Sequence, residues 1–107
     1  MSETHPAIDL DTMQAAAAQA CALLKVLSNP DRLLLMCQLS QGELSVGELE
    51  TQLGIRQPTL SQQLGVLREN GLVTARRDGK NIFYSVASPE ALAVMAVLYE
   101  QFCSSAK

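Results

Sequence analysis

The sequence predicts a mostly α-helical domain of five helices with a small two-stranded β-hairpin, and three features carry that prediction. Residues 49–73 have the pattern of a short helix, a tight turn and a longer helix. A basic hairpin signal follows at residues 72–86. The first and last helices carry more apolar surface than one small domain can bury, which predicts a homodimer.

Length and charge limit the possible classes of protein. A chain of 107 residues predicts one soluble domain, and its net charge of −3 looks unsuitable for binding nucleic acid. The charge is unevenly distributed, however. Residues 55–81 hold five basic and two acidic side chains, a local charge of +3, and the remainder carries −6. A phosphate backbone interacts with the local charge, so this asymmetry favours a targeted DNA binder.

Residues 1–10 are polar and acidic, and we expect a flexible tail there, followed by one domain over residues 11–107. This start lacks the basic and then apolar pattern of a signal peptide, and no apolar run approaches the ~20 residues of a membrane span. We therefore expect a cytoplasmic protein without a membrane partner, whose three cysteines rest as thiols. The single histidine, His5, has too few convergent ligands around it for a metal site, and no cofactor is expected.

The first helix is expected over residues 11–27, because alanine dominates MQAAAAQACALLKVL and is the strongest helix former. Its apolar side chains are small on almost every side. Such a helix can pack closely on its own core and on a neighbouring subunit. Cys21 lies among the alanines and is expected to be a small buried residue.

The second helix is expected over residues 31–40, with Asn29 as N-cap and Pro30 at the first helical position. DRLLLMCQLS is almost wholly apolar, so this helix should be central to the core. It contains Cys37 and ends at Gly42, as helices commonly do at a glycine.

The next two helices form the predicted helix-turn-helix. Ser45 and Glu48 have the spacing of a capping box at the start of the short helix, and Gly54 ends it at the turn. In the longer helix, a buried stripe at i, i+4 and i+7 is formed by Leu60, Leu64 and Leu67. Pro58 is tolerated in its first turn, where no backbone N–H bond is lost.

The other side of the longer helix gathers Gln57, Ser61, Gln62 and Arg68. Amides, hydroxyls and guanidinium groups suit hydrogen bonds to base edges and phosphates, which predicts a helix in the DNA major groove. An ordinary amphipathic pair of helices would show the same apolar stripe, and that alternative stays open here.

After a stop at Asn70-Gly71, strands are expected over residues 72–77 and 81–86 around an Asp78-Gly79 turn. The tip of this hairpin is basic, since it carries Arg76, Arg77 and Lys80. Docked beside a helix-turn-helix, such a hairpin is a wing that lays cations along phosphates. A solvated basic loop is the alternative.

The last helix is expected over residues 91–103, capped by Ser88. Two of its faces are apolar, because apolar side chains stand at Leu92, Val94, Met95, Val97, Leu98, Tyr99 and Phe102. We therefore expect a dimer through the first and last helices. A two-fold dimer presents two recognition helices to an inverted repeat in double-stranded operator DNA.

The segments LSNPDRLLLMCQL, ELSVGELETQLGIRQPTLSQQLGVLRENGLV and RRDGKNIFYSV together resemble the ArsR-type winged helix-turn-helix repressors over roughly residues 20–87. The resemblance implies a homodimeric transcriptional repressor that leaves its operator when an inducer binds or reacts. It is not expected to be an enzyme, since no nucleophile and base are paired in the sequence.

The resemblance also suggests which residues contact DNA. Gln57, Ser61 and Gln62 become the expected base contacts, and Thr59 and the cations of the wing are expected on phosphates. Where many members have a capping Ser or Thr, this chain has Arg56, which has no acceptor and is expected on a phosphate. The full predicted DNA-binding set is Arg56, Gln57, Thr59, Ser61, Gln62, Gln63, Arg68, Arg76, Arg77 and Lys80.

The inducer site is suggested by what the chain lacks and what it keeps. Metal-sensing members carry Cys-x-Cys where this chain has residues 45–47 as Ser-Val-Gly, and zinc-binding members carry His on a last helix that here has none. The remaining pair, Cys37 and Cys103, resembles the dithiol subgroup of BigR-, SqrR-, YgaV- and HlyU-like regulators. In that subgroup two cysteines sense persulfides or oxidants by forming a disulfide or polysulfide bridge, a pattern in which Cys21 has no role.

Three alternatives stay open at this point. A reactive cysteine needs nearby cations to stabilise its thiolate, and Lys107 is the one cation in helical reach of Cys103. From the residues alone, Cys37 and Cys103 therefore fit structural thiols, as in a constitutive HlyU-like regulator. The thiols could instead bind a soft metal or a metalloid such as arsenite. The apolar helices could also belong to a protein-interaction module that binds no DNA.

Overall fold

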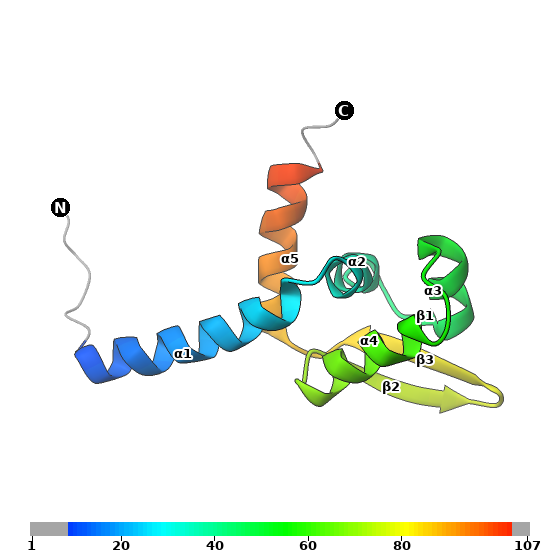
Figure 1. Ribbon diagram of the computed structural model, residues 1–107, viewed down its shortest axis with the longest axis horizontal. Helices are drawn as coiled ribbons and strands as arrows, with labels where there is room; N and C mark the ends of the chain where they lie inside the picture. The colour runs from blue at the N-terminus through cyan, green and yellow to red at the C-terminus, as the bar shows by residue number, and fades with distance from the viewer. Residues whose placement is uncertain (1–8, 104–107) are drawn as a thin grey trace.

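A computed structural model describes residues 9–103 of the chain (Figure 1). Residues 1–8 of the predicted tail, including His5, lie outside the described residues. The last residue of that predicted tail, Leu10, is already part of the first helix. In chain order the elements are α1 (Leu10–Leu27), α2 (Pro30–Leu39), β1 (Leu44–Ser45), α3 (Val46–Leu53), α4 (Thr59–Glu69), β2 (Val73–Asp78), β3 (Asn81–Val86) and α5 (Pro89–Phe102). The five predicted helices and the hairpin are thus confirmed.

Four of the helices have a polar N-cap residue, whose side chain accepts a hydrogen bond from a backbone N–H group that would otherwise be unpaired. Asp9 accepts from the Thr12 N–H at 2.7 Å, which is why α1 begins one residue earlier than expected. The predicted caps of α2, α3 and α5 are confirmed: Asn29, the capping box of Ser45 with Glu48, and Ser88.

The core forms around α2, which contacts α1, α3, α4 and α5. Leu35 and Met36 of α2 are fully buried, in agreement with its predicted central place. The predicted apolar stripe of α4 is also confirmed, because Leu60, Leu64 and Leu67 are all fully buried. These contacts fix which side of α4 faces solvent.

The wing has one more strand than predicted. The sheet is antiparallel with the order β1-β3-β2, and the short β1 pairs Leu44 with Tyr84 and Ser45 with Phe83. Two residues show no alternation of polar and apolar side chains, so the sequence pattern gave no sign of this strand. The predicted Asp78-Gly79 turn is shifted by one residue: Asp78 pairs with Asn81, and Gly79 turns with a φ of +65°.

Helix α1 extends away from the body of the protein, while α5 rises from the body on another side (Figure 1). Only Val26 and Leu27, at the end of α1, are buried. The prediction that Cys21 is buried is wrong for the single chain, because its thiol is exposed. None of the described helices is both long and apolar enough to cross a membrane.

Candidate nucleic-acid interface and thiol pair

Helix α4 presents its polar side to solvent. The stripe of Leu60, Leu64 and Leu67 is turned inward, so Ser61, Gln62 and Arg68 are exposed and Thr59 is half-exposed. Arg56 and Gln57 are exposed in the turn that leads into the helix. The structure therefore brings these six predicted DNA-binding residues to one end or one face of α4.

The start of α4 is capped from outside the helix. Pro58 at the N-cap offers no side-chain acceptor. Gln57 supplies one, since its Oε1 accepts from the Ser61 N–H at 3.1 Å and from the Ser61 hydroxyl at 2.7 Å. Two predicted base contacts are thus bonded to each other, and the amide nitrogen of Gln57 remains as a donor for an outside acceptor.

Gln63 is placed differently from the other predicted DNA contacts. It is half-buried, and its Oε1 accepts a 2.9 Å hydrogen bond from Nη1 of Arg32 on α2. Gln63 therefore faces the interior side of α4, and the structure does not bring it to the exposed polar face. Neither the helix period nor the resemblance indicated a partner 31 residues away.

The cations of the wing differ in whether they are paired with an acidic residue. Arg77 and Lys80 are exposed at and near its tip. Arg76 instead donates from Nε and Nη2 to the two carboxylate oxygens of Glu43, both at 2.8 Å, and its guanidinium lies 4.6 Å from the centre of the Phe83 ring. The hydrogen bonds from Arg76 lower the pKa of Glu43, so Glu43 stays ionised to a lower pH than an ordinary glutamate does.

A cavity of about 350 Å³ joins the wing to the helix-turn-helix. Its lining includes Lys80 and Asn81 from the wing, Gln57 and Ser61 from the start of α4, and Gly47 from α3. Predicted DNA-binding residues from two parts of the chain therefore gather around one hollow, although Lys80 lies 23 residues from Gln57 and 19 from Ser61 in sequence.

The two thiols of the predicted inducer site come from neighbouring elements. Cys37 is half-buried on α2, Cys103 is exposed at the end of α5, and α2 packs on α5. Burial raises the pKa of the Cys37 thiol, and a negative charge on Cys103 raises it further. The structure therefore brings Cys37 and Cys103 within electrostatic reach of each other, and both are free thiols. Over residues 9–103, no three His, Cys, Asp or Glu side chains gather into a group that could hold a metal ion.

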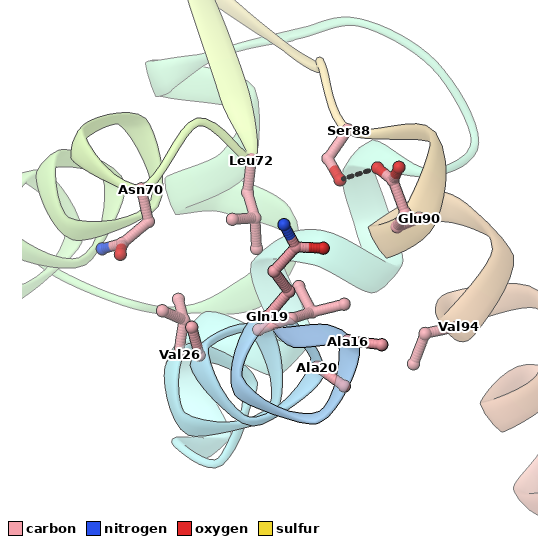
Figure 2. A pocket seen from close by; sticks show the side chains of 11 residues that line it. Ala16, Gln19, Ala20, Val26, Asn70, Leu72, Ser88, Glu90 and Val94 are labelled. Carbon is pink, nitrogen blue, oxygen red and sulfur yellow. Dashed lines mark hydrogen bonds between the residues drawn. The ribbon is translucent and has the colours of Figure 1, made fainter. Parts of the chain in front are cut away.

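A groove of about 650 Å³ runs between α1 and the body (Figure 2). Ala16, Ala20 and Val26 line its α1 side, and Val94 of α5 and Leu72 line the opposite side. The small side chains of α1 leave this space open in the single chain, and the groove exposes apolar surface from the two helices that were predicted to form a dimer.

Comparisons with known proteins agree with this architecture. Residues 29–75 match the family described as "Bacterial regulatory protein, arsR family". The chain is 55% identical to a "Biofilm growth-associated repressor" of Agrobacterium fabrum over 97 residues, 91% of this chain and 83% of that protein. It is similar to the crystal structure of the transcriptional repressor BigR from Xylella fastidiosa, with a TM-score of 0.83 and 52% identity over 91% of this chain and 99% of that one.

A solution structure from Mycobacterium bovis, Mb0332, is also similar. It is described as a homodimeric winged helix-turn-helix DNA-binding domain, and it matches with a TM-score of 0.71 and 32% identity over 89% of this chain and 88% of that one.

Proposed function

This chain belongs to the arsR family of bacterial regulatory proteins, and from that membership we propose that it is a homodimeric transcriptional repressor controlled by sulfur chemistry at Cys37 and Cys103. The repressor assignment is supported by the 55% identical relative and by BigR, both described as repressors. The control by sulfur is supported by the thiol pair itself.

Helix α4 is the proposed major-groove helix. Gln57, Ser61 and Gln62 contact bases, and the phosphates are bound by Arg56, Thr59, Arg68, Arg77 and Lys80. Arg76 contributes by holding the wing to Glu43, since its Nε and Nη2 each donate to that carboxylate. Gln63 contributes from the interior side of α4.

A second copy of the chain covers the exposed apolar surface of α1 and α5 in the proposed dimer. Leu10, Met13 and Leu24 of α1 are 65%, 53% and 55% exposed, and Val97 and Phe102 of α5 are 56% and 75% exposed. Such surface on a single chain is typical of a subunit interface. The homodimeric state of the similar Mycobacterium bovis protein supports this assembly, and a two-fold dimer suits an inverted-repeat operator.

The observation that carries the sensing proposal is the electrostatic interaction between the two thiols across the α2–α5 contact. Cys103 is exposed and meets the inducer first, because Cys37 is half-buried and held as a thiol by its raised pKa. The inducer is a hydropersulfide such as glutathione persulfide.

The bridge between Cys37 and Cys103 forms in two stages. Cys103 takes the outer sulfur of glutathione persulfide and becomes a persulfide, while glutathione leaves as its thiol. Cys37 then gives up its proton and attacks the inner sulfur, that of Cys103, which forms a disulfide and releases the outer sulfur as hydrogen sulfide. If Cys37 has also become a persulfide, the two persulfides condense to a trisulfide and release hydrogen sulfide. In both cases the cysteine sulfurs are oxidised and the transferred sulfur that leaves is reduced to sulfide.

Bridging would alter DNA binding through α2. The bridge ties α2 to α5, which belongs to the proposed dimer interface, while α2 also packs on α4. A small shift of α2 against α5 would therefore change the separation of the two recognition helices in the dimer and lower operator affinity.

Mass spectrometry tests this site directly. Reduced protein is treated with glutathione persulfide, hydrogen peroxide or sulfide, and the peptides of Cys37 and Cys103 are mapped. The expected product of the persulfide treatment is a cross-link between the two peptides, either as a disulfide or with one added sulfur. Independent modification of the two cysteines without any cross-link would refute the bridge. Cys21 serves as the internal control, since it should remain outside the cross-link.

The same pair of thiols supports a second candidate, the binding of a thiophilic ion such as arsenite. Titration of the reduced protein with arsenite and with glutathione persulfide, side by side, separates the two, because only the effective inducer releases operator DNA.

A further inference from the structure

Arg32 connects three helices that the proposed function uses. Its Nε donates to the backbone oxygen of Val26 in the last turn of α1 at 2.6 Å, and its Nη1 donates to Oε1 of Gln63 on α4 at 2.9 Å. Arg32 itself belongs to α2. One guanidinium therefore bridges a dimer helix, the helix of Cys37 and the recognition helix.

The local sequence fixes where this side chain emerges. Asn29 caps α2 by accepting from the Arg32 N–H at 3.0 Å, and Pro30 starts the helix. Val26 is one of the last four residues of α1, whose carbonyl groups lack a partner within the helix. The planar guanidinium has several donors in a rigid fork, so it can hold this carbonyl and Gln63 at the same time.

The bond to Gln63 constrains α4 in a way that its apolar stripe does not. Leu60, Leu64 and Leu67 pack without directional preference, so they tolerate small rotations of the helix. A half-buried hydrogen bond is directional. Gln63 lies directly after Gln62, so the bond at Gln63 sets the angle at which Gln62 faces the DNA.

We propose that Arg32 is a positioning residue that transmits movement of α1 and α2 to the recognition helix through Gln63. Gln63 then contributes to operator recognition by fixing the orientation of α4 from its interior side, and not by contacting a base. The regulatory part rests on the proposed function: Cys37 lies on the same rigid α2, so a shift of α2 on bridging also displaces the guanidinium that holds Gln63.

The test uses substitutions that break the link without opening a large cavity. Gln63→Met keeps the length of the side chain and removes the acceptor, and Arg32→Met removes the donor. Gln63→Glu restores an acceptor for Arg32. Gln38→Met is the matched control, because Gln38 also makes a side-chain hydrogen bond from α2 to the helix-turn-helix, with Gln52 of α3. Melting temperature and helical content verify that each variant is folded.

The first readout is the ratio of operator affinity to affinity for unrelated DNA, measured with reduced full-length protein. We expect Gln63→Met and Arg32→Met each to lower this ratio by about 5-fold, the double variant to lower it no further, and Gln63→Glu to recover most of it. A base contact by Gln63 gives a different result: Arg32→Met is then harmless, and Gln63→Glu changes the preferred base. Either observation would overturn the positioning role.

The second readout is the ratio of operator affinities between reduced and persulfide-treated protein. We expect this ratio to fall by about 5-fold in Gln63→Met and by less than about 2-fold in Gln38→Met. Equal ratios in Gln63→Met and wild type would overturn the regulatory part. A wild-type protein that binds operator but ignores persulfide refutes the sensing proposal instead, and the first readout still decides the positioning role.

Discussion

Glu43 and Arg76 face each other across the middle of the wing, joined by two hydrogen bonds of 2.8 Å between guanidinium and carboxylate. Glu43 directly precedes β1, and Arg76 belongs to β2, so the pair spans the whole three-stranded sheet across β3. The Phe83 ring of β3 lies beneath the same guanidinium. The wing is therefore fixed to the start of the helix-turn-helix by a group that sequence alone assigned to DNA.

Neutralising Glu43 should release Arg76 toward phosphates. For Glu43→Gln we expect a rise of about 2- to 5-fold in affinity for any DNA, and a salt dependence steeper by about one phosphate contact. Fluorescence anisotropy at several salt concentrations measures both. Glu69→Gln removes an equal charge at the last residue of α4 and serves as control. An equal rise in both variants would show a general charge effect and no special role for the ion pair.

Substitutions at the wing tip and on the exposed face of α4 should affect DNA binding in different ways. Lys80→Ala should weaken binding to operator and unrelated DNA alike and reduce the salt slope by about 1, because it removes a phosphate contact. Gln62→Ala should cost operator affinity about 1–3 kcal/mol and leave unrelated DNA unaffected. Competition binding on both DNAs distinguishes them. Sequence-dependent loss in Lys80→Ala would contradict the assignment of the wing to phosphates.

The two thiols should differ in reactivity with pH. Cys37 has a raised pKa, so it stays protonated at pH values where an ordinary thiol ionises, and its alkylation should lag behind that of exposed Cys103. Its reaction rate should rise as the pH climbs through the raised value. Because a charged Cys103 contributes to the shift, Cys103→Ser should move the midpoint for Cys37 to lower pH. Peptide mass spectrometry after timed iodoacetamide labelling measures this; faster labelling of Cys37 than of Cys103 would contradict the structure.

The dimer interface should depend on the outer surface of α1. Met13→Asp or Leu24→Asp places a charge on an exposed apolar position, so we expect folded monomers with strongly reduced operator affinity. Sedimentation velocity measures the change. Thr51→Asp, on the exposed side of α3, is the control and should remain dimeric. A dimer that survives both α1 substitutions would place the interface elsewhere.

Local signals predicted most of the fold. The caps at Asn29, Ser45 and Ser88, the glycine at the end of α3 and the stripe of Leu60, Leu64 and Leu67 each depend on residues within one or two turns, so their physical cause is visible in the sequence. Strand β1 was not predicted, because it forms only through pairing with β3 and its two residues are too few to show a strand pattern.

The candidate site was predictable only as far as residue type. The polar face of α4 and the two thiols follow from composition and resemblance. The partners Arg32 of Gln63 and Glu43 of Arg76 do not, because they lie 31 and 33 residues away and are selected by packing. Exposure of Cys21 was also unpredictable, since alanine-rich helices suit a buried place and a projecting one equally well.

Bridging of Cys37 and Cys103 is proposed to control operator binding, and one measurement tests this control most directly. Operator affinity is compared before and after treatment with glutathione persulfide for wild type, Cys37→Ser, Cys103→Ser and the control Cys21→Ser. We expect persulfide to weaken binding by about 10-fold or more in wild type and Cys21→Ser, and to leave Cys37→Ser and Cys103→Ser bound. Release of operator by Cys37→Ser or Cys103→Ser to the same extent as by wild type would contradict the account.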